Sequence, residues 1–280
     1  MQTVLSSYKS KNEFEYVHSI DDALSTTSFK LHHHSDNYEI LLFINGNSQF
    51  HVEGTVYFIK PYDIVTVRSN EMHIMSHHEP LTPYERIIIN VKEDFFIKNG
   101  CEDFKRMFTN RPLGVDNLIA SDFVCTHNIP QIMLDMEKYM KDDTSSANIV
   151  LRSKLIELLY NLNILCGKSD ENRFYDERIK DIILYINEHL VSPLSLDHIA
   201  NHFFQSKYHI CHIFKQQTGM TINQYIIYKR LLLARELYLK GKNLMEASME
   251  AGFGSYSTFY KLYTREMGKS PREDLINRKK

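Results

Sequence analysis

Four side chains in the first part of the chain are of types that bind metal ions: His32, His34, Glu39 and His73. A His-x-His pair, a carboxylate shortly after it and a later histidine offer three imidazole nitrogens and one oxygen. Such a set suits Fe, Mn, Ni or Zn. The same groups could instead hydrogen-bond the polar atoms of a small organic molecule. His33, His77 and His78 fit surface or strand-end positions.

A second set of side chains that could do chemistry lies between Ala251 and Pro271. Gly252 and Gly254 predict a turn, and Ser255 is a residue type that caps helices. A helix should follow, because apolar residues recur at helical spacing before a glycine and a proline end the run: Phe259, Leu262, Tyr263, Gly268 and Pro271. The opposite face carries hydrogen-bonding or cationic groups, namely Tyr256, Ser257, Tyr260, Lys261 and Thr264. Such a face could enter a groove of a nucleic acid.

The same pattern occurs 49 residues earlier in the chain. Caps, core positions and terminal glycines correspond, so that Ser206, Ile210, Phe214 and Gly219 match Ser255, Phe259, Tyr263 and Gly268. The exposed face of the earlier copy would hold Lys207, Tyr208, Cys211, His212 and Lys215. Residues 222–240 contain no helix breaker and predict one long helix between the copies. We therefore expect two helix-turn-helix units joined by a rigid helix; the alternative is a plain helical bundle core.

Charge is divided unevenly along the chain, although the net charge at pH 7 is only -2. Residues 176–280 contain 16 Lys and Arg residues against 11 Asp and Glu residues, a net charge of +5. The remaining residues carry 17 against 24, a net charge of -7. A basic C-terminal part behind an acidic body indicates that only the C-terminal part meets a polyanion.

Short strands are the elements that would position the histidine cluster. β-prone runs separated by turn residues are predicted at 39–44, 49–52, 55–59, 64–67 and 86–91. Turn-forming sequences such as Asn45-Gly46-Asn47 lie between them and suggest hairpins. Evenly spaced short strands of this kind favour a β-sandwich or barrel, a fold that can contain a ligand.

Helical spacing replaces the strand pattern after residue 94. Amphipathic helices are predicted at 129–140 and 147–166, and the second carries a wide leucine-rich stripe. That stripe fits packing onto the β-domain and an interface between subunits equally well. Residues 167–175 are polar and rich in helix breakers, and Ser195 is expected to cap a later short helix. We therefore predict two domains, 1–170 and 171–280.

Composition sets the class of protein. With 280 residues, 43% of them hydrophobic and 24% charged, the chain can form two globular domains with separate cores. The scattered thiols Cys101, Cys125, Cys166 and Cys211 argue against a disulfide framework or a structural zinc site and fit a reducing compartment. The first 16 residues lack the apolar core of a signal peptide, and no stretch approaches the length of a membrane span. We expect a cytoplasmic protein without a membrane partner.

The C-terminal part of the chain resembles the AraC/XylS family of bacterial transcription regulators. The matching segments are Ser206 to Gly219, Arg230-Leu231-x-x-Ala234-x-x-Leu237, and Gly252-Phe253-x-Ser255 followed by Phe259 and Gly268-x-x-Pro271. The N-terminal part resembles the cupin-like sensor domain of many members, through His32-x-His34, Tyr38-Glu39-Ile40, Gly46, Gly54, Tyr57, Pro61-Tyr62-Asp63, His73 and Tyr84-Glu85-Arg86. The resemblance implies an α+β multidomain protein, with an N-terminal cupin-like β-barrel, flanking helices and a C-terminal, all-α tandem helix-turn-helix domain.

The resemblance also implies roles for residues on the two predicted helices. Positions that face the DNA groove in the family match Tyr208, Cys211 and His212 in the first helix and Tyr256, Ser257, Tyr260 and Lys261 in the second. Lys207 and Lys215 are expected to contact phosphates, which position a protein without reading sequence. The two helices would enter successive major grooves about 34 Å apart on one side of the duplex.

For the N-terminal domain, the resemblance implies an effector. We favour an organic effector bound by His32, His34, Glu39 and His73, without metal or cofactor, because Tyr62 stands where metal-binding cupins have a glycine. A small polar molecule is expected, and a sugar is one candidate. The alternative is a metal-dependent cupin enzyme, an isomerase or dioxygenase, with a helical appendage. We expect a regulator rather than an enzyme, a homodimer on double-stranded DNA with RNA polymerase as a further partner.

Overall fold

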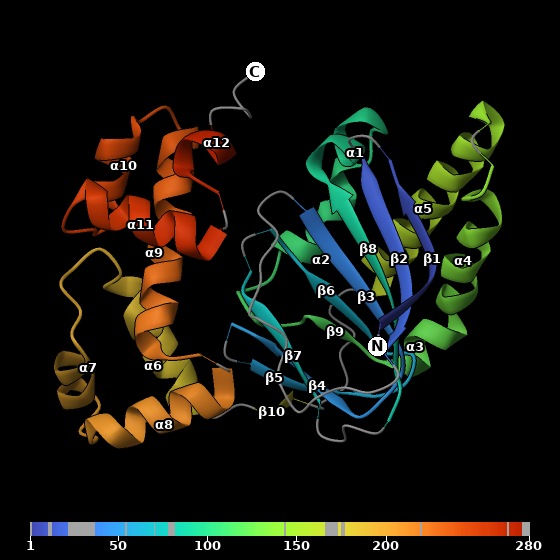
Figure 1. The fold of residues 1–280 in the computed structure, drawn as a ribbon. Coiled ribbons are helices and arrows are strands. Elements are labelled where there is room, and N and C mark those ends of the chain that lie inside the picture. The colour runs from blue at the N-terminus through green and yellow to red at the C-terminus, as the bar shows by residue number, and fades with distance from the viewer. Residues whose placement is uncertain are drawn as a thin grey trace. The chain divides into compact units, whose positions relative to one another are not determined.

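The structure, a computed structural model, describes residues 2–10, 13–21, 37–53, 55–69, 71–77, 82–142, 144–165, 173–174, 177–218, 220–267 and 269–275. The chain divides into two compact units, Met1–Tyr175 and Asp176–Lys280. Strands and covering helices form the first unit, and helices form the second (Figure 1).

Two antiparallel sheets form the centre of the first unit. The larger sheet has the order β1-β2-β8-β3-β6-β9 and consists of β1 (Gln2–Lys9), β2 (Phe14–Asp21), β3 (Asn37–Asn45), β6 (Ile64–Val67), β8 (Tyr84–Lys92) and β9 (Leu118–Ile119). The smaller sheet has the order β10-β5-β4-β7 and consists of β4 (Ser48–Val52), β5 (Thr55–Ile59), β7 (His73–His77) and β10 (Arg173–Phe174). All five predicted strands are therefore confirmed.

One detail of the strand prediction is wrong. The turn at residues 45–47 does not close a hairpin, because β3 belongs to the larger sheet and β4 to the smaller one. The same is true of the connection from β5 to β6. The chain thus crosses between the sheets at both places, whereas β4 and β5 pair directly as a hairpin. These crossings bring the inner faces of two sheets together.

Alternation along β3 separates two hydrophobic cores, because successive side chains of a strand point to opposite faces. Leu41 and Phe43 lie in the core between the sheets, together with residues of β4, β5, β6 and β7. Ile40 and Leu42 lie in the other core, on the face that the helices cover. Glu39 shares the parity of Leu41 and Phe43, so its carboxylate faces the interior between the sheets.

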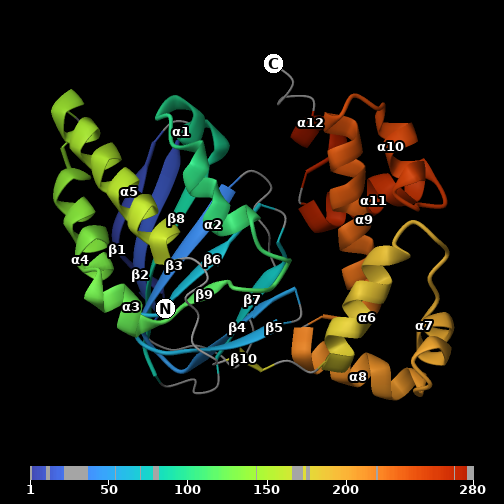
Figure 2. The ribbon, with the colours of Figure 1, turned by 180° about the vertical axis from the view of Figure 1, so that it is seen from behind.

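Helices cover the other face of the larger sheet, as Figures 1 and 2 show. They are α1 (Glu93–Lys98), α2 (Arg106–Thr109), α3 (Ser121–Thr126), α4 (Ile129–Met136) and α5 (Ser145–Leu165), with 3-10 helices at Glu102–Lys105 and Glu137–Tyr139. The helices predicted at 129–140 and 147–166 are confirmed. The leucine stripe of α5 packs in the helix-covered core, while Ile149, Tyr160 and Ile164 on its other side are exposed.

The regular elements described in the second unit are all helices. They are α6 (Glu177–Glu188), α7 (Leu196–His202), α8 (Lys207–Thr218), α9 (Ile222–Leu239), α10 (Leu244–Glu250), α11 (Tyr256–Met267) and α12 (Pro271–Leu275). None of the helices within the described ranges of either unit is long and apolar enough to cross a membrane.

Serine side chains start three of these helices where the sequence predicts caps. Ser195 accepts a hydrogen bond from the backbone of His198 (3.1 Å), and Ser206 accepts one from His209 (3.2 Å). Ser255 does the same for Thr258 (3.2 Å). Each bond satisfies a backbone N–H that has no partner within its helix. The capped helices α8 and α11 both contain 12 residues.

Helix α9 is the connecting rod. At 18 residues it is about 27 Å long. Near its start, Tyr225 packs edge-on against Phe214 of α8. Toward its end, Leu231 and Ala234 lie in a core shared with Phe259 of α11. Figures 1 and 2 show α9 extending from the group of α6, α7 and α8 to the group of α10, α11 and α12.

Candidate functional site

The predicted groove face of α8 is largely open to solvent. Tyr208 is 80% exposed, and its ring is nearly parallel to that of His212, with 6.1 Å between the ring centroids. Lys215 is exposed, whereas Cys211 is partly buried between them. Lys207 Nζ lies 2.7 Å from Asp197 Oδ1 of α7. Its charge is thus partly balanced within the unit, while the other side chains can meet a partner directly.

The corresponding face of α11 is also accessible. Ser257, Tyr260 and Lys261 are exposed. Tyr256 is partly buried against the core of this unit, and its ring centroid lies 6.3 Å from that of Tyr260. Residues of the opposite face, Phe259 and Tyr263, are fully buried. The polar and apolar faces thus separate as the sequence predicts, and Tyr256 both packs on the core and supports Tyr260.

The two turns that precede these helices differ by one residue. Four residues, 203–206, join α7 to α8, while five residues, 251–255, join α10 to α11. The second residue after the first helix has left-handed backbone in both turns: Phe204 has φ 53° and Gly252 has φ 89°. Glycine adopts this conformation freely, but phenylalanine does not.

Phe204 is a residue that the sequence did not single out. Its side chain is 93% exposed. A strained backbone and an exposed aromatic ring at one position do not serve the packing of this unit. Only the backbone angle reveals the strain, since Phe203-Phe204 reads in sequence as ordinary core.

Across the sheets of the first unit, the structure brings together two of the four residues of the predicted histidine cluster. Glu39 of β3 and His73 of β7 are both at least 98% buried, and His73 Nε2 lies 3.7 Å from Glu39 Oε1. His73 Nδ1 lies 3.0 Å from the carbonyl oxygen of Glu71 and can donate to it. The ring stacks on Phe50, with 5.6 Å between centroids. His32 and His34 lie outside the described residues.

Further polar groups line the same interior. Asp21 of β2 accepts a 2.6 Å hydrogen bond from Arg86 of β8, and both side chains are buried. The Arg86 guanidinium lies over the ring of Tyr84, 4.3 Å from its centroid. Burial raises the pKa of the Tyr84 hydroxyl well above its usual range. His77 lies against the same tyrosine, with ring centroids 4.6 Å apart. The interior thus offers carboxylate acceptors and cationic donors beside apolar surface.

The described residues contain no complete set of metal ligands. Among them, no three His, Cys, Asp or Glu side chains gather as the ligands of one ion. The three cysteines they include, Cys101, Cys125 and Cys211, are free thiols. The predicted four-residue cluster as a whole stays a prediction, because two of its members, His32 and His34, lie outside the described residues.

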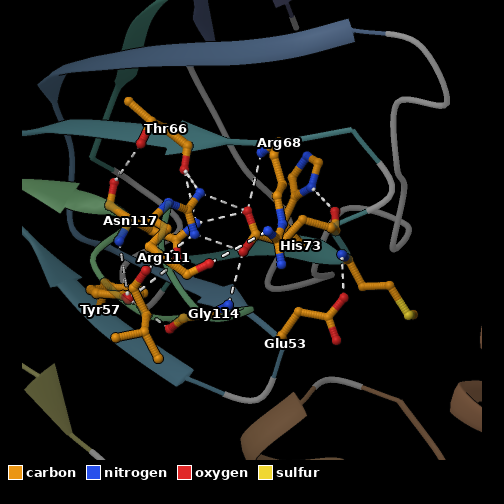
Figure 3. Close-up of polar contacts among 11 residues, drawn as sticks. Glu53, Tyr57, Thr66, Arg68, His73, Arg111, Gly114 and Asn117 are labelled. Carbon is orange, nitrogen blue, oxygen red and sulfur yellow. Dashed lines mark hydrogen bonds and ion pairs between the residues drawn. The ribbon is translucent and has the colours of Figure 1, made fainter. Parts of the chain in front are cut away.

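A buried ionic network beside this interior was not predicted. The Glu71 and Arg111 side chains are 0% and 2% exposed, and two parallel hydrogen bonds of 2.8 Å join them (Figure 3). Gly114 N (2.8 Å) and Asn117 Nδ2 (3.0 Å) also donate to Glu71. Tyr57 donates to the carbonyl oxygen of Gly114 (2.7 Å). The network fastens residues 111–117 to the sheets.

Two opposing effects act on the pKa of Glu71. Burial raises it, but the hydrogen bonds and charge of Arg111 and the backbone donors outweigh burial, so that the pKa lies below the ordinary value of 4.5. The carboxylate is therefore charged at neutral pH and fully enclosed. The Glu71 carboxylate already accepts hydrogen bonds from Arg111, Gly114, Asn117 and Arg68, so the pair holds the fold together and is not assigned to solute binding.

Two family descriptions match the chain over most of its length. The AraC-like ligand binding domain matches residues 19–159, half of the chain. The helix-turn-helix domain matches residues 199–275. The first match covers β3 through β9 and most of the helices that pack on the larger sheet, and the second covers α8 through α12.

Relatives of comparable length are regulators. The probable transcriptional regulator LumQ of Photobacterium leiognathi is 23% identical over 245 residues, which cover 86% of this chain and 90% of LumQ. The HTH-type transcriptional activator RhaS of Escherichia coli (strain K12 / DH10B) is 22% identical over 258 residues, which cover 91% of this chain and 90% of RhaS. Among solved structures, ToxT from Vibrio cholerae is 15% identical, with a TM-score of 0.38 and coverage of 95% of this chain and 98% of ToxT.

Proposed function

This chain belongs to the AraC family of DNA-binding transcriptional regulators that carry a ligand-binding domain, and we propose that it reads its operator with α8 and α11 together. The observation that carries the proposal is the repeated pair of capped 12-residue helices, each with an open polar face, at opposite ends of α9. Two such helices on one rod suit successive major grooves on one side of a duplex.

The polar residues on these faces determine how sequence can be read. None of the residues assigned to the two faces is an arginine. The two-pronged contact of arginine with guanine is therefore not expected from them. Tyr208, His212 and Tyr260 would supply single hydrogen bonds and contacts with thymine methyl groups. Lys215 and Lys261 would contact phosphates or base edges.

We assign effector binding to the interior between the two sheets. Glu39, His73 and Arg86 there face apolar residues, a mixture that suits a small molecule with several hydrogen-bonding groups. A sugar is one class with that chemistry, and His32 and His34 would complete the site. Effector affinity and DNA affinity would be coupled reciprocally, each raising or lowering the other by the same factor.

We further propose a homodimer formed through α5. Ile149, Tyr160 and Ile164 lie on its outer side and are 63%, 53% and 44% exposed, an apolar stripe at helical spacing that the unit itself leaves uncovered. A regulator of this kind would act in the cytoplasm, on DNA and beside RNA polymerase. The relatives regulate transcription and lend no support to the alternative of a metal-dependent enzyme.

Binding to DNA tests the main proposal. Duplexes enriched by the purified chain from a randomised pool serve as the probe, and fluorescence anisotropy measures affinity. Tyr208→Ala and Tyr260→Ala are each expected to weaken binding by about tenfold or more, since each removes a base-edge contact. Tyr62→Ala, an exposed tyrosine of the other unit, should leave affinity unchanged. Wild-type affinity in both helix variants would contradict the assignment.

Effector binding is tested separately. A thermal-shift screen of sugars and sugar acids should identify a compound that raises the melting temperature of the wild-type chain. Glu39→Gln keeps the shape of the side chain but removes its charge, so the shift should shrink. An effector whose shift is equal in wild type and Glu39→Gln would place its site elsewhere.

A further inference from the structure

Arg230, near the middle of α9, joins this helix to the segment that follows α6. Its Nε donates to the carbonyl oxygen of Leu190 (2.8 Å), and its Nη2 donates to that of Ser192 (2.7 Å). Both acceptors are main-chain atoms, so the contact depends on where the backbone lies and not on side-chain identity. One guanidinium thus fixes the segment that follows α6 to α9 at two points.

Gly252, in the turn before α11, lies close to the same segment after α6 and to Arg230. A Cβ added there would lie 3.0 Å from the Cα and the carbonyl oxygen of Val191 and 3.0 Å from Arg230 Nε. Real Cβ atoms are essentially never closer than this to other atoms. The backbone of the second turn therefore touches the backbone between the two carbonyls that Arg230 holds.

Three segments thus meet around one side chain: the connection after α6, the middle of α9 and the turn before α11. Helix α9 is the covalent link between the two helix-turn-helix units, and small bends or twists of one helix would change their relation. With this meeting point, the helix-turn-helix unit of α8 and the helix-turn-helix unit of α11 are fastened to each other at a second place.

We propose that Arg230 and Gly252 form a junction that sets the separation and relative rotation of α8 and α11, and through them the spacing of the two DNA sequence blocks that the protein accepts. The inference rests on the proposed function, that both helices read one site. Arg230 acts here as a positioning residue, since the atoms it contacts are main-chain atoms of its own chain.

The junction matters because DNA geometry is demanding. Adding one base pair between two blocks moves them apart by about 3.4 Å and rotates one against the other by roughly 35°. Contacts as close as those around Gly252 tolerate much smaller movements. A protein with an intact junction should therefore accept one spacing, and a protein without it should accept several.

The test is selection of duplexes from a randomised pool by the full-length chain, followed by sequencing. In wild type, two conserved blocks at one fixed separation are expected. Arg230→Gln cannot reach both carbonyls, and Gly252→Ala forces a methyl group against Val191. In both variants the same two blocks should be enriched, but at separations spread over at least one base pair more. The readout is spacing, which a general loss of stability would not change.

Two other glycines provide matched controls. Gly254, in the same turn, has nothing within 4 Å of an added Cβ. Gly241 has φ 104° but also has nothing within 4 Å, so Gly241→Ala introduces left-handed strain without a clash. Both variants should select the wild-type separation. Broadening in either would mean that any change in a turn, and not the junction in particular, alters the spacing, and would overturn the inference.

Affinities for duplexes that differ in the separation of the two blocks test the same prediction. Inserting one base pair between the blocks should weaken wild-type binding by roughly tenfold or more, but Arg230→Gln binding by less than about threefold. The junction is refuted if the insertion weakens binding of wild type and Arg230→Gln equally. It is also refuted if both junction variants select a range of separations as narrow as that of wild type. Failure of the wild-type chain to enrich two blocks would instead refute the proposed function. Because two different substitutions attack the junction, misfolding of one leaves the other as the test.

Discussion

Replacing Arg111 by methionine should be among the most destabilising single changes in the first unit. The substitution keeps most of the side-chain volume but removes the charge that faces Glu71. Both side chains are almost fully buried, and the pair shares two hydrogen bonds of 2.8 Å. Leaving a buried charge without its partner costs about 3–5 kcal/mol.

The remaining donors narrow that range. In the variant, Glu71 would keep hydrogen bonds from Gly114 N, Asn117 Nδ2 and Arg68 N. We therefore expect a loss near the lower limit, about 3 kcal/mol, which is a large share of the roughly 5–15 kcal/mol that stabilises a typical domain. Urea denaturation followed by circular dichroism measures the loss, and faster hydrogen exchange in residues 111–117 should locate it.

The pH dependence of folding stability provides a second, independent test. In the folded wild type the pKa of Glu71 is below 4.5, so its stabilising contribution is present above that pH and is lost as pH falls through the folded-state pKa. Without Arg111, burial would raise the pKa above its unfolded value. Acidification then protonates Glu71 in the folded variant and restores stability.

The deficit of Arg111→Met relative to wild type should therefore shrink between about pH 7 and about pH 5. Arg106→Met is a matched control, because Arg106 is 63% exposed and pairs with the exposed Asp103; it should change stability little. A deficit below about 1 kcal/mol for Arg111→Met, or one that grows on acidification, would refute the reasoning.

Three further outcomes follow from single residues. Phe204→Gly should raise the unfolding free energy by about 1 kcal/mol, because glycine adopts the left-handed backbone without strain. If calorimetry finds the variant less stable than wild type, this prediction is wrong. Lys261→Ala should weaken operator binding and lower the salt dependence by about one phosphate contact; an unchanged salt slope would remove Lys261 from the interface. Tyr160→Glu should halve the mass measured by light scattering, and a mass that stays dimeric would exclude the outer side of α5 as the interface.

Local signals in the sequence predicted much of this fold. The caps Ser195, Ser206 and Ser255 and the unbroken helix at 222–239 are confirmed, because capping and helix propensity depend on neighbouring residues. Strand β1 was not predicted, since most of its residues are exposed and show no apolar alternation. The crossings between sheets were missed for a related reason: turn residues specify a bend but not the sheet that the next strand joins.

Long-range contacts could not be predicted from the sequence. Glu71 and Arg111 are 40 residues apart and lie in polar segments that resemble solvated loops. Only the fold shows that they meet with almost no exposure to water. Likewise, Glu39 and His73 were predicted to belong to one site, but their closeness depends on β3 and β7 facing each other across two sheets. The contact of Gly252 with Val191 has no local signal beyond the glycine itself.

Hydroxyl-radical footprinting on a duplex enriched by the chain tests the central claim most directly, that α8 and α11 read one DNA site together. Wild type should protect two short regions, about one helical turn apart, on the same face of the duplex. Tyr208→Ala should weaken protection of one region and Tyr260→Ala that of the other. A single protected region, or two regions that respond together to either substitution, would contradict the assignment of one groove to each helix.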